Sequence, residues 1–252
     1  MRINRRKFLK AGGAATLVMG VLPVAQALAE KRQSGEAADV KWGLAVDLRA
    51  CWEHQQAGCR ECMDACHYEH NVPVGQGSKE EIKWIWSAPF KEVFPELEGV
   101  WEEDLANSAA LALCNHCDNP PCVRVCPTKA TFQTKTGITV MDYHRCIGCR
   151  YCMAGCPYGA RSFNFRDPRP FIDKANPSYP TREKGVVEKC NLCAERLADG
   201  LKPLCVDVCP HGVLYFGNLK DPQSEISRVL KDRFSLQRKA ELGTRPKVYY
   251  LL

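Results

Sequence analysis

Eight cysteines in two tight groups between residues 114 and 157 constrain this chain more than any other feature. The first group reads CNHCDNPPCVRVCP and the second reads CIGCRYCMAGCP, and each ends with a cysteine directly before a proline. A zinc site needs only four ligands in total, and a disulfide framework gives no reason for two such similar runs. The repetition predicts that these loops wrap metal centres. The positions are Cys114, Cys117, Cys122 and Cys126, then Cys146, Cys149, Cys152 and Cys156.

The spacing of these thiols selects the kind of metal centre. Thiolates are the soft ligands that iron–sulfur cores require. Three closely spaced cysteines and a fourth before a proline form the ligand pattern of bacterial two-cluster ferredoxins, in which the fourth cysteine ligates the other cluster. Where four protein thiolates hold a cluster, no iron is open to a substrate. Such sites transfer electrons and do not bind reactants.

Eight further cysteines form two more groups, one on either side of that stretch. In the earlier group seven residues separate Cys51 from Cys59, where the ferredoxin spacing has two. A loop at residues 52–56 would explain the gap; alternatively Cys51 is a free or structural thiol and only three sets are complete. In the later group a helical turn is expected over residues 194–198. The positions are Cys51, Cys59, Cys62 and Cys66, then Cys190, Cys193, Cys205 and Cys209.

The first 29 residues have the composition of an export signal. A twin-arginine pattern at residues 4–10, NRRKFLK, precedes a Gly/Ala-rich apolar run and an Ala-Leu-Ala site that ends at Ala29. The run is about long enough for a membrane anchor, but its glycines and Pro23 make a poor span, so a cleaved signal is favoured. The twin-arginine route carries proteins already folded around cofactors. It places the mature protein on the extracytoplasmic, or periplasmic, side of the membrane.

The net charge of the chain does not indicate a nucleic-acid partner. Five of the 35 basic residues lie in the first 29 residues, which contain no acid, and 30 basic and 29 acidic residues remain. Four clusters with sixteen thiolates would add roughly −8 to this balance. The apparent basicity therefore gives no support to nucleic-acid binding. Catalysis is not indicated either, because the sequence contains no Gly-rich phosphate loop, nucleophile–base pair or H-E-x-x-H motif.

Short strands and hairpins are expected around the cysteine groups. A turn between residues 130–134 and 138–142 predicts a hairpin beside the clusters. Residues 67–113 are expected to form an insertion that covers the cluster core and offers a docking surface. Residues 224–242 predict an amphipathic surface helix with Phe234 on its apolar face. Further strands are expected at 41–48, 83–86, 90–94, 161–165, 213–216 and 247–251, and a loop at 167–180.

With all four groups in place, the chain resembles the four-cluster ferredoxin subunits of membrane-associated respiratory oxidoreductases. The resemblance covers about residues 41–252. It rests on CNHCDNPPCVRVCP, on CIGCRYCMAGCPYGAR, and on KCNLC followed after eleven residues by CVDVCP. More narrowly, CRECMDACH, RDPRPFI and GVVEKCNLC resemble the periplasmic iron–sulfur subunit (DsrO type) of the DsrMKJOP complex tied to sulfite reduction.

This resemblance implies an α+β fold of two ferredoxin-like modules, one inserted in the other, with loop-rich insertions. The outer module would comprise residues 41–110 and 180–252, and the inner module residues 111–179. The resemblance also implies four [4Fe-4S] clusters whose fourth ligands are exchanged within each module. The implied sets are Cys114, Cys117, Cys122 with Cys156; Cys146, Cys149, Cys152 with Cys126; Cys51, Cys59, Cys62 with Cys209; and Cys190, Cys193, Cys205 with Cys66.

The resemblance further implies partners for a peripheral electron-transfer subunit. One is a quinone-interacting integral membrane subunit (NrfD-like), and others are a multihaem cytochrome c and further subunits of the complex. No direct small-molecule substrate is expected. Two alternatives remain open: the electron-transfer subunit of a molybdopterin oxidoreductase of the polysulfide, tetrathionate or nitrite reductase kind, and a secreted disulfide-rich or zinc-binding module.

Overall fold

A computed structural model describes residues 40–252 except 76, 78–79 and 98–105. The predicted export signal at residues 1–29 therefore lies outside the described residues. Within the described part of the chain, no helix is both long enough and apolar enough to cross a bilayer.

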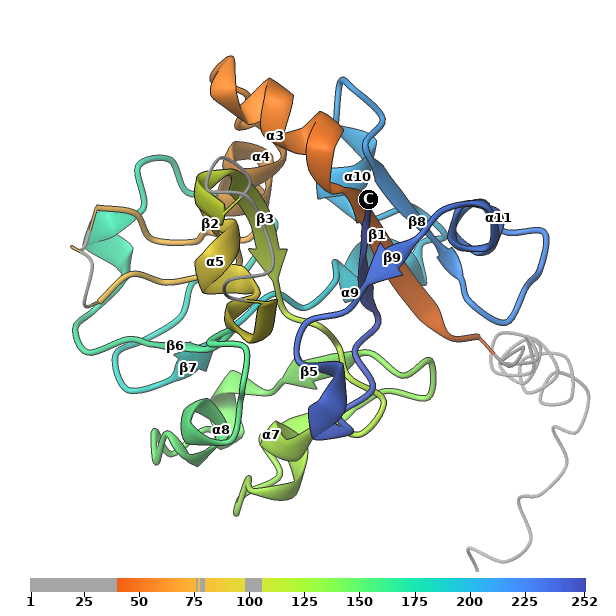
Figure 1. Cartoon of the computed structure of the whole chain (residues 1–252). Coiled ribbons are helices and arrows are strands. Elements are labelled where there is room, and N and C mark those ends of the chain that lie inside the picture. Colours follow the sequence, from red (N-terminus) through yellow and green to blue (C-terminus); the bar gives the residue numbers. More distant parts are fainter. Residues whose placement is uncertain (1–39, 76, 78–79, 98–105) are drawn as a thin grey trace, which may run out of the picture. The chain divides into compact units, whose positions relative to one another are not determined.

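The largest sheet joins segments from opposite ends of the described chain. Strand β1 (Trp42–Asp47) lies between two later strands, antiparallel to β8 (Leu214–Asn218) and parallel to β10 (Val248–Leu251) (Figure 1). The short strand β9 (Ser235–Leu236) pairs with β10 at the edge. The three strands predicted for β1, β8 and β10 are therefore confirmed.

Side-chain alternation along β1 gives this sheet two buried faces. Leu44 and Val46 point into the main core, which also contains many of the cysteines. Ala45, between them, packs on the opposite face with Ile226 of helix α11 (Glu225–Asp232). The sheet thus separates the cysteine-bearing core from a helix that covers its outer side.

The gap between the first two cysteines is helical, so the loop predicted at residues 52–56 is wrong. Helix α3 (Leu48–Gln56) begins at Asp47, whose Oδ1 accepts a hydrogen bond from the backbone N–H of Ala50 at 3.1 Å. It ends just before Gly58, which has a left-handed φ of 92°. The capped helix takes up the additional residues and buries Cys51 on its inner face.

The described residues of the segment predicted as an insertion include two paired strands and short helical turns. Strand β2 (Ile85–Pro89) pairs antiparallel with β3 (Ala109–Leu113). Residues 90–94, predicted as a strand, instead begin with the one-turn helix α5 (Phe90–Val93). The rings of Phe90 and Phe94 stack 4.6 Å apart in the core. Helical i, i+4 spacing produces this contact, whereas in an extended strand the two residues would lie about 13 Å apart.

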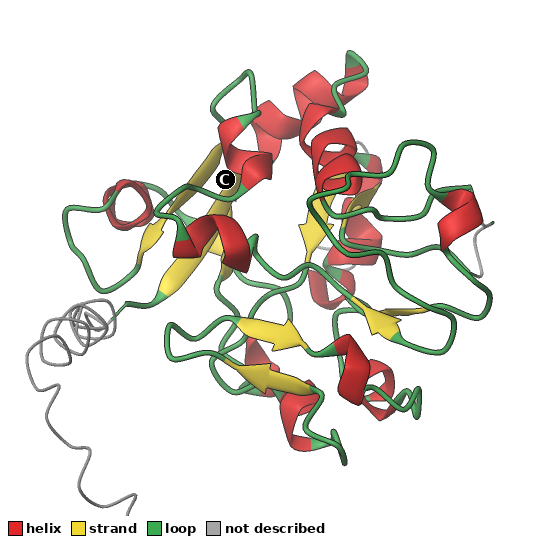
Figure 2. Ribbon diagram, turned by 180° about the vertical axis from the view of Figure 1, so that it is seen from behind, coloured by secondary structure: helices red, strands yellow, loops and turns green. Residues whose placement is uncertain are grey.

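Short elements surround the two middle cysteine groups. The predicted hairpin is confirmed as β4 (Thr131–Gln133) and β5 (Thr139–Met141). Strand β6 (Ser162–Phe163) pairs with β7 (Val187–Glu188). Figure 2 shows that loops connect most of these elements, which gives a mixed α/β fold of short helices and small sheets. The helical turn predicted over residues 194–198 is confirmed as α9 (Ala194–Ala198). Further short helices are η2 (Pro95–Leu97), α7 (Pro121–Arg124), η3 (Tyr143–Arg145), α8 (Tyr151–Ala154), η4 (Arg169–Phe171) and η5 (Ala240–Leu242).

The helix predicted over residues 224–242 is shorter than expected. Helix α11 ends at Asp232, because the chain then extends to form β9 beside β10. Phe234 therefore does not lie on the buried face, and its side chain is 88% exposed. Pairing with a distant strand has overridden the local helical pattern.

Ser224 caps α11 and offers a test of its stability. Its Oγ accepts a hydrogen bond from the backbone N–H of Ser227 at 3.3 Å. Ser224→Ala is expected to lower the free energy of unfolding by about 1 kcal/mol, measured as a lower midpoint in anaerobic denaturant titration. Lys231→Ala, an exposed substitution on the same helix, is the control and is expected to shift stability by less than about 0.5 kcal/mol.

Candidate metal centres

Sixteen free thiols gather into four sets of four. All sixteen cysteines lie in the described residues, and none forms a disulfide. Three sets line separate cavities, and the mutual electrostatic effects of buried sulfurs identify the fourth. Set A is Cys51, Cys59, Cys62 and Cys209; set B is Cys114, Cys117, Cys122 and Cys156; set C is Cys126, Cys146, Cys149 and Cys152; set D is Cys66, Cys190, Cys193 and Cys205.

Helices α4 (Glu61–Glu69) and α10 (Leu204–Asp207) each serve two sets. Helix α4 carries Cys62 of set A and, one turn later, Cys66 of set D. Helix α10 carries Cys205 of set D, and Cys209 of set A follows just beyond its end. Because these helices pack against each other, sets A and D are neighbours.

Helices α7 and α8 repeat this arrangement for the other two sets. Helix α7 carries Cys122 of set B, and the chain beyond it supplies Cys126 to set C. Helix α8 carries Cys152 of set C, and the chain beyond it supplies Cys156 to set B. The fourth cysteine of each group therefore crosses to the neighbouring set, as in the pairing that the family resemblance implies.

Cys51 lies with the rest of set A. Its cavity also contains His54, Gln55 and His211. Gln55 donates a hydrogen bond from Nε2 to the sulfur of Cys51 at 3.2 Å. Burial raises the pKa of Cys51 to about 11. The hydrogen bond from Gln55 lowers this pKa, and the nearby sulfurs of Cys209 and Cys59 raise it further. Helix α3 thus compensates for the long sequence gap by delivering this thiol to the cavity.

Left-handed backbone recurs inside the cysteine loops. His116, Arg150 and Leu192 each have a positive φ, between 41° and 62°, within a C-x-x-C segment. Such turns aim consecutive backbone N–H groups at one point and form anion-binding concavities. In set D the N–H of Leu192 lies 3.3 Å from the sulfur of Cys190, and the N–H of Leu204 lies 3.4 Å from that of Cys193.

The deeply buried thiols Cys62 and Cys117 are not tuned for nucleophilic chemistry. Burial and neighbouring sulfurs raise the pKa of Cys62 and of Cys117 to about 12. Reactive cysteines have the opposite shift, towards the thiolate, and lie in electropositive, partly exposed places. A bound metal core deprotonates its thiols outright, so these buried groups are suited to metal ligation.

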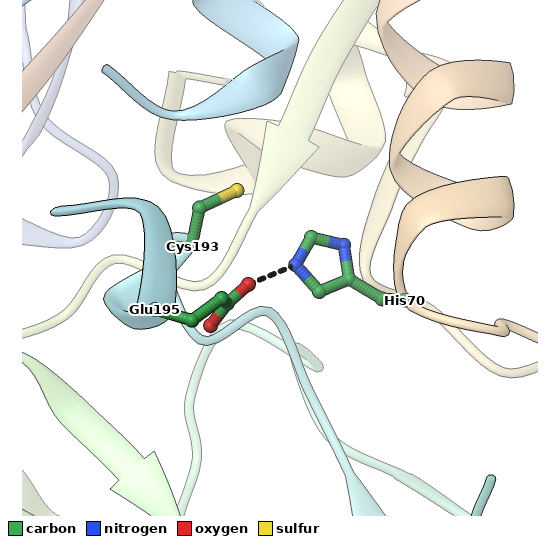
Figure 3. A group of neighbouring side chains, drawn as sticks. All are labelled: His70, Cys193 and Glu195. Carbon is green, nitrogen blue, oxygen red and sulfur yellow. Dashed lines mark hydrogen bonds and ion pairs between the residues drawn. The ribbon is translucent and has the colours of Figure 1, made fainter. Parts of the chain in front are cut away.

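His70 and Glu195 form a polar pair beside set D. The Nε2 of His70 lies 2.8 Å from Oε1 of Glu195 (Figure 3). The Nδ1 of His70 lies 3.0 Å from the carbonyl oxygen of Cys66 and 3.6 Å from its sulfur. Together with Cys193 these side chains have the donor types of a metal site. Since Cys193 belongs to set D, we assign the pair to the surroundings of that set. Sequence reasoning missed both residues, and the only signal was the helical spacing of Cys66 and His70.

Two histidines, His116 and His144, lie close to cluster cysteines in the sequence. His116 is buried, and its Nδ1 accepts a hydrogen bond from the N–H of Thr139 at 3.3 Å. Burial and the nearby cations of Lys189, Lys247 and Arg161 hold the pKa of His116 well below its usual value, so the ring is neutral. His116 therefore packs as a core residue, while His144 contributes a backbone contact to the short helix η3.

Two buried cations fit anionic clusters at these sets. Arg161 is 5% exposed and Lys189 is 1% exposed. Arg161 donates hydrogen bonds to a thioether and a hydroxyl and is also in hydrogen-bonding contact with the sulfurs of Cys122 and Cys152. Lys189 donates to the carbonyl oxygens of Thr139 and Cys190. In the described part of the chain, no carboxylate forms an ion pair with either one. Buried charges require counter-charges, and thiolate-bound iron–sulfur clusters would supply them.

The chain is similar to known iron–sulfur proteins over nearly its whole length. A family model for the 4Fe-4S dicluster domain matches residues 109–168 and 175–219. The Hdr-like menaquinol oxidoreductase iron-sulfur subunit 1 of Archaeoglobus fulgidus is 40% identical, over 98% of this chain and 97% of that protein. A tetrathionate reductase subunit of Salmonella typhimurium is 34% identical, over 100% of this chain and 89% of that protein.

A third relative has the same kind of role. The menaquinone reductase iron-sulfur cluster-binding subunit of Nitratidesulfovibrio vulgaris is 35% identical, over 84% of this chain and 89% of that protein. All three are subunits of oxidoreductases, and the names of two of them specify iron–sulfur subunits. The four thiol sets and these similarities together show that the chain belongs to the family of non-catalytic iron–sulfur electron-transfer subunits of oxidoreductase complexes.

Proposed function

We propose that the chain holds four [4Fe-4S] clusters, one at each of sets A to D, with all sixteen cysteines as ligands. The observation that carries the proposal is the gathering of the thiols into four sets of four. A [4Fe-4S] cluster accepts and releases one electron without a change in its ligands. The protein's residues hold such centres apart from bulk water and fix their order.

We infer the order of the sets from the pairs of sulfurs that affect each other's pKa electrostatically, because such sulfurs lie close together. Cys62 of set A acts electrostatically on Cys66 and Cys205 of set D. Cys114 of set B acts on Cys190 of set D, and Cys122 of set B acts on Cys152 of set C. These neighbours support a linear order A–D–B–C. The terminal sets contain the most accessible cysteines, since Cys149 of set C is exposed and Cys59 of set A is half-exposed.

The exchange of fourth cysteines supports two nested modules. In this proposal residues 41–110 and 180–252 form the outer module with sets A and D, and residues 111–179 form the inner module with sets B and C. The β1–β8–β10 sheet fits this division, because its strands come only from the outer segments. In this division an electron crosses between modules at the step from set D to set B, and the β6–β7 pair also joins the two modules.

The relatives suggest partners for the two ends. We propose that one end docks on a quinone-interacting membrane subunit of the NrfD-like kind and the other on a further redox subunit, with a multihaem cytochrome c in the complex. The names of two relatives include menaquinol or menaquinone. We further propose that the chain functions in sulfur metabolism, after twin-arginine export, as a peripheral protein on the extracytoplasmic side.

A molybdopterin enzyme is the second candidate partner, and the similarity to the Salmonella tetrathionate reductase subunit is the observation that favours it. Purification of the native complex from membranes separates the two. Haem c without molybdenum is expected for the Dsr-type assembly, and a molybdenum subunit would overturn it. A protein recovered only in the cytoplasmic fraction, with its first 29 residues intact, would contradict the export proposal.

Cys51 is the ligand whose assignment needs a direct test. Cys51→Ser is expected to lower the iron content by up to about four atoms per chain, or to convert one cluster to a three-iron form visible by EPR. Cys62→Ser, at the conventionally spaced position of the same set, is the matched comparison and should change the same cluster. Unchanged iron and spectra in Cys51→Ser, with a loss in Cys62→Ser, would show that Cys51 is not a ligand.

A further inference from the structure

Arg161 forms the wall between the cavities of sets B and C. Its side chain lines the cavity of set B together with Cys114, Cys122 and Cys156. From that position its guanidinium donates from Nη2 to Oγ1 of Thr131 at 2.8 Å and from Nη1 to Sδ of Met141 at 3.2 Å. Thr131 and Met141 both line the cavity of set C. The cation therefore faces one set and is anchored to the lining of the other.

The hairpin beside the clusters fixes this position. Thr131 of β4 and Met141 of β5 are directly paired across the hairpin, so the two anchors of the guanidinium lie side by side. The hydroxyl of Thr131 donates to the carbonyl oxygen of Val140 at 3.0 Å, which leaves its lone pairs directed at Arg161. Burial of Thr131 and Arg161 keeps water from replacing either contact.

The groups that favour the charged form of Arg161 are sulfurs. The sulfurs of Cys122, Cys152 and Cys114 lie within electrostatic range, and their effect outweighs burial so that the pKa of Arg161 is raised. Two of these belong to set B and one to set C. In the described residues no carboxylate pairs with the guanidinium, so a protein anion does not neutralise its field.

We propose that Arg161 tunes the reduction potentials of two clusters: its permanent positive charge raises the potentials of the clusters at sets B and C together. This inference rests on the ligand assignment proposed above. A cation stabilises the more negative, reduced form of a nearby cluster, and a desolvated cation does so far more strongly than a surface one. Because it lies between both sets, it acts on both clusters.

The charge balance of the electron step follows from the same contact. When one electron enters set B or set C, the cluster gains one negative charge and no bond to the protein forms or breaks. The guanidinium is already protonated and stays so, since arginine does not deprotonate in proteins. The added charge is therefore compensated without proton uptake at this place, and an electron can pass between the inner sets without waiting for a proton.

The test compares neutral and charged replacements in the loaded protein. Arg161→Gln, with wild-type iron content, is expected to lower two of the four potentials in an EPR-monitored redox titration. At a fixed potential the reduced-to-oxidised ratio of those two clusters should fall at least tenfold, which is 59 mV for a one-electron couple. Arg161→Lys keeps the charge and is expected to hold both ratios within tenfold of wild type.

Arg145→Gln is the control. This arginine directly precedes Cys146 of set C, but its side chain is 65% exposed and pairs with Asp142 at 3.1 Å. Water screens its charge, so all four potentials should stay near their wild-type values. A shift in this variant as large as in Arg161→Gln would overturn the special role of the buried charge.

The remaining outcomes are also decisive. If Arg161→Gln loses iron, Arg161→Met serves as the neutral variant with wild-type iron content, and the same fall of two potentials is expected in it. Unmoved potentials in Arg161→Gln, an equal shift of all four clusters, or Lys behaving like Gln would overturn it. The iron content of the unmodified protein tests the ligand assignment separately, so failure of one claim is distinguishable from failure of the other.

Discussion

A protein with Cys66→Ala is expected to lose about four iron atoms per chain and to stop electron passage between its two ends. Cys66 belongs to set D, which stands between set A and set B in the proposed order. Cys66 is also among the most deeply buried of the sixteen thiols, so no water or surface group can replace it without reorganising the core. Loss of set D leaves set A without a near neighbour.

EPR of the fully reduced protein measures this separation. Coupling between electron spins falls steeply with distance, so set A should give the spectrum of an isolated cluster while sets B and C remain a coupled pair. Cys149→Ala is the matched variant, because it removes the exposed terminal set C and should leave sets A, D and B coupled in a row. A Cys66→Ala protein that loses four irons but keeps every wild-type coupling would contradict the order A–D–B–C.

The second large effect concerns stability. Glu188→Gln is expected to lower the stability of the protein by about 3–5 kcal/mol, because it leaves the buried guanidinium of Arg182 without its counter-charge. The two side chains are 0% exposed and meet at 2.6 Å. Glu188 also accepts hydrogen bonds from Trp84 Nε1 at 3.0 Å and from Asn164 Nδ2 at 2.6 Å. In the glutamine an NH2 group takes the place of one carboxylate oxygen, so the donors that bonded to that oxygen lose their acceptor.

The network around this ion pair ties distant segments to set D. Arg182 donates to the carbonyl oxygens of His70 and Asn71, at the end of the helix that carries Cys66. Its guanidinium also lies 5.4 Å from the ring centroid of Trp84. We therefore expect Glu188→Gln to loosen set D together with the fold, and to release its iron first on heating.

Thermal scans at one fixed rate, under anaerobic conditions, compare the variants, because cluster loss makes unfolding irreversible. Arg166→Gln is the control: its ion pair with Glu80 has the same 2.6 Å separation, but the arginine side chain is 55% exposed. Removal of such a surface pair should cost no more than about 1 kcal/mol. Equal decreases of the unfolding temperature in Glu188→Gln and Arg166→Gln would mean that burial of the Arg182–Glu188 pair does not determine how much the pair contributes to stability.

Local sequence patterns predicted the parts of the fold that depend on local spacing. The hairpin at residues 130–142 and the cysteine-bearing turns follow from neighbouring residues alone. The helix at residues 48–56 was missed, because the unusual gap after Cys51 suggested an added loop, whereas the Asp47 cap begins a helix there. The end of α11 was missed because pairing of β9 with a strand more than ten residues later decides it.

The surroundings of the thiol sets depend on contacts between distant residues. Arg161 ends a motif that is recognised by its cysteines, and nothing local shows that its guanidinium reaches Thr131 and Met141. The same holds for the contact between His70 and Glu195, which are 125 residues apart. Cysteine spacing identifies the ligands of a cluster, but the groups that set its potential come from tertiary packing.

Anaerobic counting of iron and acid-labile sulfide, combined with an EPR-monitored redox titration, tests the central claim most directly. The account predicts about sixteen iron and sixteen sulfide per chain and four one-electron steps, from four thiol sets that each hold one [4Fe-4S] cluster. A colourless protein containing zinc, or one with no metal and eight disulfides, would contradict the account. About eight irons per chain would contradict the assignment of all four sets.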